Sequence, residues 1–192
     1  KPYGAQTRRF EEAFDARASE FEIGLAYLRG SETTERDLPY HPIVALNEKS
    51  STLHYQHKRT DVKDGATCLI DAGTRDRGYA SDITRTYARE NAHPVFRSLL
   101  SGVEKLQKRL VSMVRPTVQY IELHHEAHMG LAKILNENGI LKISEEEAVN
   151  AGVTRTFFPH GLGHMLGIQV HDVAGATDEG LTHPLRELYP KI

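Results

Sequence analysis

Two aspartates stand on either side of a predicted β-hairpin, where like charges that face each other destabilise a sheet. Asp71 follows a short β-prone run at 67–70, and Asp82 lies inside a longer β-prone run at 79–87. The residues between the runs, 74–78, are polar and include a glycine, which is typical of a turn. We therefore expect an antiparallel strand pair that carries both carboxylates.

The register of this hairpin decides whether the two carboxylates meet. A turn centred between Asp76 and Arg77 makes Asp71 and Asp82 direct cross-strand partners, with Cβ atoms about 4.5 to 5.5 Å apart. Like charges at that separation destabilise a sheet unless a cation neutralises them. The separation also suits carboxylates that bridge two metal ions about 3.5 to 4 Å apart. A shifted register, with the acids on opposite faces, is the structural alternative.

A second group of polar residues lies in a glycine-rich stretch at 158–172. It contains His160, His164 and His171, and histidine is both the commonest metal ligand and the usual proton carrier near neutral pH. Glycines allow close backbone approach, so these imidazoles can converge on one small site. The glycines also resemble a phosphate loop, but their spacing does not match the dinucleotide motif.

Other candidate groups have a structural interpretation. His54 is a lone histidine at the end of a β-prone run, and His124 with His128 falls one residue short of the zinc-binding H-E-x-x-H pattern, because position 129 is Met129. We expect His124 and His128 to be polar residues on the exposed face of a helix. Cys68 lies within an apolar strand run, where a thiol is usually inert packing.

Composition excludes several classes of protein. The 192 residues carry a formal charge of -2 and no long basic run, so a nucleic-acid partner is not expected. No apolar stretch approaches the ~20 residues of a membrane span, and a single cysteine fits a reducing compartment, so we expect a cytoplasmic protein with no membrane partner. Because the first residue is Lys1, we also expect the sequence to be an internal piece of a longer chain.

The order of predicted elements favours an α+β fold. Strand pairs are expected at 42–46 with 52–55 and at 67–70 with 79–87, and helices follow them. Ser19 and Glu22 form a capping box that opens the second helix. Helices are expected at 7–18, 19–28, 94–114 and 120–136, with a short one starting at 144.

Three motifs together are identified with a known family. Leu69-Ile-Asp-Ala-Gly73, Asp82-Ile-Thr-Arg-Thr86 and Pro159-His-Gly-Leu-Gly-His164, with Val170-His-Asp172, resemble the catalytic half of the pita-bread metallopeptidases. This family includes aminopeptidase P, methionine aminopeptidase and the Xaa-Pro dipeptidases (prolidases), and the stretch 38–48 with 53–55 looks most like the last group. The resemblance implies a mostly antiparallel, curved sheet flanked by helices.

The resemblance also implies a metal site of two Asp, one His and two Glu that holds two divalent ions, commonly Mn2+. By motif position the metal ligands are Asp71, Asp82 and His164, with Asp82 bridging the two ions. No segment of the family that carries the two Glu is present before Ile192. We therefore expect residues 1–192 to form part of a catalytic domain that lacks the family's N-terminal domain and its C-terminal ligand segments.

The same resemblance assigns roles in proton transfer and substrate binding to four further residues. His171 would stabilise the tetrahedral intermediate or assist proton transfer, His160 and His54 would line the substrate side, and Tyr40 would bind the dipeptide. The expected function is hydrolysis of Xaa-Pro dipeptides by a hydroxide activated between two metal ions, in a protein that is a homodimer at full length. The alternatives are an Xaa-Pro aminopeptidase, an organophosphate-hydrolysing relative, and a non-catalytic binding module on the same scaffold.

Overall fold

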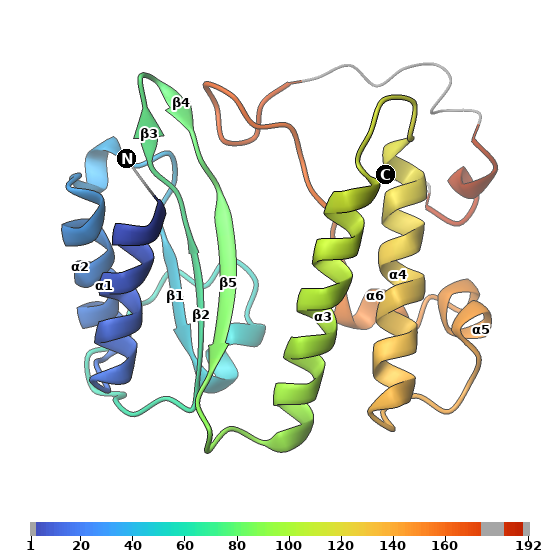
Figure 1. Cartoon of the computed structure of the whole chain (residues 1–192), viewed down its shortest axis with the longest axis horizontal. Coiled ribbons are helices and arrows are strands. Elements are labelled where there is room, and N and C mark those ends of the chain that lie inside the picture. Colours follow the sequence, from blue (N-terminus) through green and yellow to red (C-terminus); the bar gives the residue numbers. More distant parts are fainter. Residues whose placement is uncertain (1–2, 174–182, 190–192) are drawn as a thin grey trace. The chain divides into compact units, whose positions relative to one another are not determined.

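The chain forms two compact units. The computed structural model describes residues 3–173 and 183–189, and side chains from Arg9 onward. One unit, called here the sheet unit, comprises residues 1–92 with 165–173, and the other, the helical unit, comprises 93–164 with 174–192 (Figure 1). Each unit is described separately below.

Two helices and a small sheet make up most of the sheet unit. Helix α1 spans Tyr3–Asp15 and α2 spans Glu20–Ser31. The predicted capping box is confirmed, because the Ser19 hydroxyl accepts a hydrogen bond from the Glu22 N–H at 3.3 Å and the Glu22 carboxylate accepts one from the Ser19 N–H at 2.8 Å. This exchange satisfies donors that a helix start leaves open and fixes where α2 begins.

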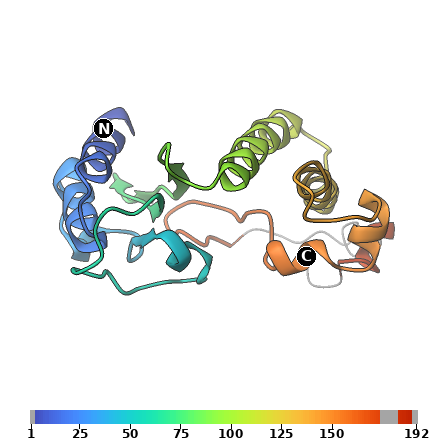
Figure 2. The ribbon, with the colours of Figure 1, turned by 90° about the horizontal axis from the view of Figure 1, so that it is seen from below.

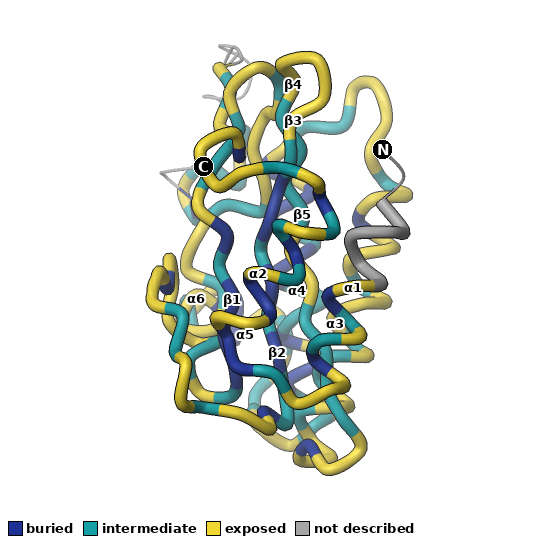
Figure 3. Tube along the Cα trace, turned by 90° about the vertical axis from the view of Figure 1, so that its left-hand side faces the viewer, coloured by how far each residue is buried: buried dark blue, intermediate teal, exposed yellow. Residues whose placement is uncertain are grey.

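The sheet has three antiparallel strands in the order β1-β2-β5. Strand β1 is Ile43–Leu46, β2 is Thr67–Ala72 and β5 is Ile83–Ala88. Alternate residues of β2, namely Cys68, Ile70 and Ala72, are buried, and they share one core with Phe10 of α1. Figure 3 shows this burial as dark blue stretches along β1 and β2. Because strand side chains alternate between faces, the other face of β2 is left for Leu69 and Asp71.

A short hairpin continues β2 and β5 beyond the sheet. Strands β3, Arg75–Asp76, and β4, Tyr79–Ala80, pair around a two-residue turn. Arg77 and Gly78 form that turn with φ of 50° and 90°, the two positive angles that a type I′ turn requires. The same register extends into the sheet, where Asp71 pairs with Thr84.

This register corrects the predicted pairing of the two aspartates. The turn is centred on Arg77 and Gly78, one residue later than expected, so Asp82 is not directly opposite Asp71. Asp82 instead precedes Thr84, the partner of Asp71, by two residues. A separation of two keeps side chains on the same face of a strand, so the two acids still share a face as diagonal neighbours.

The predicted strand at 42–46 is present as β1, but the strand predicted at 52–55 is absent. Residues Asn47–Ser51 form a short 3-10 helix, η2, and β1 pairs with β2 instead. Asn47 explains the difference, because it adopts φ 53° and its side-chain oxygen accepts hydrogen bonds from the N–H groups of Ala66 at 2.8 Å and Thr67 at 3.3 Å. This side chain ties the end of β1 to the start of β2.

Glu20 is a fully buried carboxylate at the start of α2. It accepts hydrogen bonds from the Leu46 N–H at 2.8 Å, the Tyr55 hydroxyl at 2.9 Å and the Arg59 guanidinium at 2.7 Å. Burial opposes ionisation, but the hydrogen bonds from Arg59 and the backbone outweigh it and lower the pKa of Glu20. The carboxylate therefore joins α2 to β1 and to the loop that follows η2.

Four α-helices form most of the described helical unit. Helix α3 spans Pro94–Met113 and α4 spans Tyr120–Glu137, and these two run side by side (Figures 1 and 2). The short helices are α5 (Glu145–Asn150) and α6 (Thr154–Phe157), and the 3-10 helix η3 (Pro184–Arg186) follows. The predicted helices at 94–114 and 120–136 are confirmed. Within residues 3–173 and 183–189, no helix combines the length and apolar character needed to cross a membrane.

The prediction that His124 and His128 lie on the exposed face of a helix is wrong. Their exposed fractions are 3% and 1%, and their Nε2 atoms lie 3.1 Å apart on α4. His128 Nδ1 lies 2.8 Å from the Thr154 hydroxyl, whereas His124 Nδ1 has no hydrogen-bond partner among the described residues. Burial, with a smaller contribution from nearby positive groups including Arg155, lowers the pKa of each imidazole to about 4, so both rings are neutral at pH 7.

Replacing Glu20 with Ala should destabilise the sheet unit strongly. The change removes the buried acceptor that Arg59 and the Tyr55 hydroxyl share, and breaking a buried ion pair costs about 3 to 5 kcal/mol. Urea unfolding at pH 7 measures the change. Glu48→Gln is the matched control, because Glu48 bonds the same guanidinium at 2.8 Å but is exposed, and it should change stability little. Equal effects of the two substitutions would contradict the structural role of Glu20.

The buried histidine pair should make the helical unit sensitive to mild acid. A lowered pKa means that the unfolded chain binds more protons than the folded chain between about pH 4 and 6.5, so stability should fall as the pH drops through that window. Thermal unfolding at pH 7 and pH 5 tests this. His124→Gln with His128→Gln should reduce the loss at pH 5, whereas His57→Gln, at an exposed position, should not. An equal drop in melting temperature between pH 7 and pH 5 for the wild type, the double variant and His57→Gln would contradict this prediction.

Candidate metal centre

The Tyr40 hydroxyl connects the two aspartates that the sequence singled out. Its oxygen lies 2.6 Å from Asp71 Oδ1 and 2.9 Å from Asp82 Oδ1. Tyr40 comes from the segment before β1, Asp71 from β2, and Asp82 from the residue before β5. All three side chains are half-buried. The sheet unit therefore gathers three oxygen atoms at the point where its main sheet passes into the β3–β4 hairpin.

Gly73 allows this close approach. A Cβ atom at this position would lie 1.8 Å from the Ser81 carbonyl oxygen and 2.9 Å from the Tyr40 ring. Both are closer than real Cβ contacts, and the nearer neighbour is backbone that cannot move away cheaply. Glycine at position 73 thus lets the hairpin strands and the Tyr40 ring pack together beside Asp71.

Tyr40 alone cannot donate a hydrogen bond to both Asp71 and Asp82 at the same time. A phenol has one proton to donate, yet the Tyr40 oxygen faces two carboxylates. Burial raises the pKa of the Asp71 carboxyl and the charge of Asp82 adds to the rise, although hydrogen bonds from Tyr40 and Thr84 act in the opposite direction. A bound cation would remove this conflict.

A loop of the sheet unit, residues 165–173, brings a histidine to the same place. A ring nitrogen of His171 and a carboxylate oxygen of Asp82 lie within 4.8 Å of each other. The loop is closed by a hydrogen bond from the Asp172 N–H to the Met165 carbonyl at 3.0 Å, and it contacts β4 where the Ala80 N–H donates to the Gly167 carbonyl at 2.8 Å. The structure therefore brings two of the candidate site residues, Asp82 and His171, close to each other.

The other predicted site residues differ in their surroundings. His164 is exposed and is bonded directly to Met165, the first residue of that loop. His160 is exposed, with its Nδ1 atom 2.9 Å from the Gly161 carbonyl and its ring 4.9 Å from that of Phe158. His54 is exposed in a turn, with φ 52°.

The donor atoms fit a divalent metal ion of the transition series. Carboxylate oxygens from Asp71 and Asp82 with an imidazole nitrogen form a mixed oxygen and nitrogen set, which suits manganese, iron or zinc better than an oxygen-only site would. Two carboxylates that meet at one phenolic hydroxyl place negative charge at the site, and this charge attracts a cation. Half-burial of the two acids keeps them within reach of an ion from solvent.

Two features of the site were not found from residue spacing. The direct contacts of the Tyr40 hydroxyl join positions 31 and 42 residues apart, and only the resemblance had placed Tyr40 near the substrate. Thr84 pairs with Asp71, which depends on the turn at Arg77 and Gly78. The Arg77-Gly78 dipeptide was the available signal, because glycine favours positive φ.

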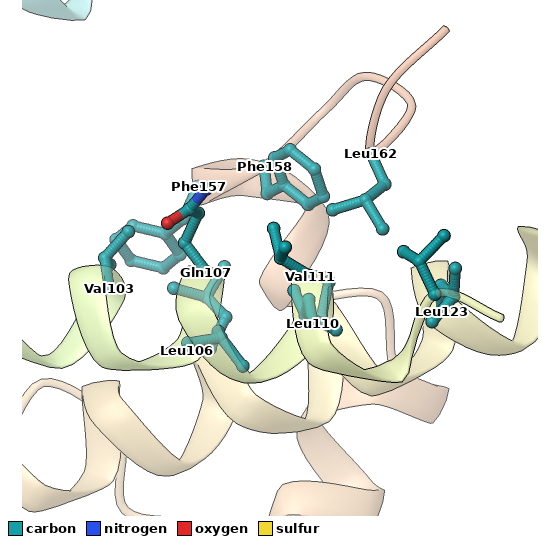
Figure 4. Close-up of a pocket in the computed structure, with 12 residues that line it drawn as sticks. Val103, Leu106, Gln107, Leu110, Val111, Leu123, Phe157, Phe158 and Leu162 are labelled. Carbon is teal, nitrogen blue, oxygen red and sulfur yellow. The ribbon is translucent and has the colours of Figure 1, made fainter. Parts of the chain in front are cut away.

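An apolar pocket in the helical unit is a weaker candidate for a catalytic site than the group around Tyr40. It has a volume of about 470 Å3 and lies among α3, α4 and α6, lined by apolar side chains such as Leu110, Leu123 and Phe157 (Figure 4). Gln107 is the one polar side chain among its described lining residues. Nothing in this pocket can act as an acid, a base or a metal ligand.

Comparison with known proteins agrees with the motifs. The model of metallopeptidase family M24 matches residues 4–187. The Xaa-Pro dipeptidase of Marinobacter nauticus is 51% identical over 172 residues, which is 88% of this chain and 39% of that protein. The Xaa-Pro dipeptidase of Stenotrophomonas maltophilia is 44% identical over 90% of this chain and 40% of its own length.

Solved structures show the same relationship at the level of the fold. The low-pH form of E. coli aminopeptidase P superposes with a TM-score of 0.82 and 29% identity, over 91% of this chain and 40% of that one. Zinc-substituted E. coli aminopeptidase P in complex with product gives 0.81 and 30%, over 88% and 39%. The predicted α+β, pita-bread fold is thereby confirmed.

The chain spans about 40% of the length of the curated relatives that it matches. The family match covers almost all of the chain, and the relatives exceed 40% identity over that part. This chain belongs to metallopeptidase family M24.

Proposed function

We propose that this chain supplies the core of the active site of a metal-dependent Xaa-Pro dipeptidase. The observation that carries the proposal is the meeting of Asp71, Asp82 and the Tyr40 hydroxyl on one face of the sheet, with His171 beside Asp82. The names of the curated relatives support the choice of substrate class. A small Xaa-Pro peptide is therefore the proposed partner of the site.

Asp71, Asp82 and His164 are the proposed metal ligands, with Asp82 bridging two ions. The two Glu ligands that the family resemblance implies are not among the residues assigned here. Divalent ions, for which we propose Mn2+, supply Lewis acidity that polarises a peptide carbonyl and lowers the pKa of water. Membership of the M24 family supports metal dependence.

Tyr40 holds the two carboxylates in place. Burial, together with the hydrogen bonds to the two aspartates, raises the pKa of this phenol well above its ordinary value, so it keeps its proton at neutral pH. A protonated hydroxyl 2.6 Å from Asp71 and 2.9 Å from Asp82 fixes the direction in which each carboxylate points. We propose that its ring also forms one side of the dipeptide pocket.

His171 is the proposed proton carrier. An Xaa-Pro bond is a tertiary amide, so the proline nitrogen carries no hydrogen and must be protonated when the bond breaks. An imidazole is a common proton carrier in enzymes, and it can deliver that proton or donate a hydrogen bond to the tetrahedral intermediate. His160 and His54 are proposed to line the substrate side of the site.

Xaa-Pro aminopeptidase activity is the second candidate, because aminopeptidase P structures share the fold at TM-scores near 0.8. The two activities differ in substrate length. Proline release from a Gly-Pro dipeptide without cleavage of a Gly-Pro-Gly tripeptide would support the dipeptidase, and the reverse preference would support the aminopeptidase.

Changing Asp82 to Asn should abolish metal-dependent proline release. The amide cannot supply the bridging negative charge, and loss of a metal ligand removes the group that activates the reaction. The assay is proline release from an Xaa-Pro dipeptide by the manganese-loaded complete gene product. Asp76→Asn, at an exposed position of the same hairpin, is the control and should retain activity. Full activity of Asp82→Asn would refute the proposed site.

A further inference from the structure

We propose that Arg75 is a positioning residue that holds His171 in place. It does so by joining the loop 165–173 to the β3–β4 hairpin. This inference rests on the proposed function only for its effect on catalysis. The contact itself lies wholly within the sheet unit.

Arg75 is bonded to the backbone of the loop. Its Nη1 atom donates to the Ile168 carbonyl at 2.7 Å and is also 3.3 Å from the Gly78 carbonyl in the hairpin turn. The neighbouring carbonyl, that of Gly167, accepts from the Ala80 N–H at 2.8 Å. Two successive carbonyls of the loop are thus held by the two strands of the hairpin, one by a side chain of β3 and one by the backbone of β4.

Packing of apolar side chains contributes little to this attachment. Met165, Leu166 and Ile168 of the loop are 58%, 47% and 64% exposed. Their burial therefore supplies little of the free energy that keeps the loop in place. Hydrogen bonds must supply more, and a charged donor makes a stronger bond to a carbonyl than a neutral donor does.

The two sides of the loop are bonded to each other. The Gly167 N–H donates to the Gln169 carbonyl at 3.1 Å, and the Asp172 N–H donates to the Met165 carbonyl at 3.0 Å. A Cβ atom at Gly167 would lie 2.1 Å from the Asp172 carboxylate, so the two sides of the loop are in close contact. A shift at Ile168 is therefore transmitted to His171, which precedes Asp172.

Hydrogen exchange tests the attachment without relying on activity. In Arg75→Gln, the Ala80 amide, which donates to the loop, should exchange roughly fivefold faster or more. The Ser81 amide donates to Thr74 within the hairpin at 2.8 Å and should be unchanged, which shows that the hairpin is intact. Arg75→Lys should restore protection in part. Arg77→Gln, in the exposed turn of the same hairpin, should match the wild type. Unchanged exchange at Ala80 in Arg75→Gln would overturn the proposal.

Kinetics of the manganese-loaded complete gene product test the link to His171. Arg75→Gln should lower kcat by roughly tenfold, leave KM within about twofold, and leave the metal content unchanged, because a transition-state contact is lost. An unchanged kcat despite faster exchange would overturn the positioning role, as would a loss of activity that follows a loss of metal. If the wild type releases no proline, the proposed function fails, whereas the exchange experiment still decides whether Arg75 holds the loop.

Discussion

The contact of one phenol with two carboxylates sets the requirements that the sheet unit has to meet. Tyr40 reaches Asp71 and Asp82 only because both acids lie on the same face, and they do so because the register of β2 with β5 places Asp82 two residues from the partner of Asp71. That register follows from the turn at Arg77 and Gly78. A register shift of one residue would move every side chain of one strand to the other face of the sheet.

Glu20 and the pair Asp71 and Asp82 differ in the hydrogen-bond donors that surround them. Glu20 is surrounded by donors, including the guanidinium of Arg59, and its pKa is lowered, so its charge is fully compensated within the fold. Asp71 shares one phenolic proton with Asp82 and has its pKa raised. Removing the partner of a buried acid costs stability, so Glu20 depends on its donors. Acids whose pKa is shifted by burial and by a second acid are typical of functional sites. This contrast separates the structural acid from the proposed metal ligands.

The histidines also fall into a buried, structural pair and an exposed residue beside the site. His124 and His128 are buried and neutral, their Nε2 atoms contact each other, and His128 is also hydrogen-bonded to Thr154, so they belong to the packing of the helical unit. His171 is exposed and lies beside Asp82. An exposed imidazole can exchange protons with a substrate, and a buried one cannot do so without a large change in structure.

Local signals in the sequence predicted more than the long-range ones did. The capping box at Ser19, the periodicity of α3 and α4, and the hairpin around the aspartates all depend on neighbours within a few residues, and all are present. The pairing of β1 depends on the Asn47 side chain reaching residues 19 and 20 positions away, and the burial of His128 depends on Thr154. The hydrophobic periodicity of a sequence does not predict such contacts, because they are set by tertiary packing.

The central claim is that Asp71 and Asp82 share a face in order to bind metal. The most direct measurement is elemental analysis of the complete gene product after manganese loading and dialysis, made on the wild type and on Asp71→Asn. The account predicts stoichiometric, tightly held metal in the wild type and a clear deficit in Asp71→Asn, since one carboxylate ligand has lost its charge. Equal metal content in the two proteins, or no retained metal in the wild type, would contradict it.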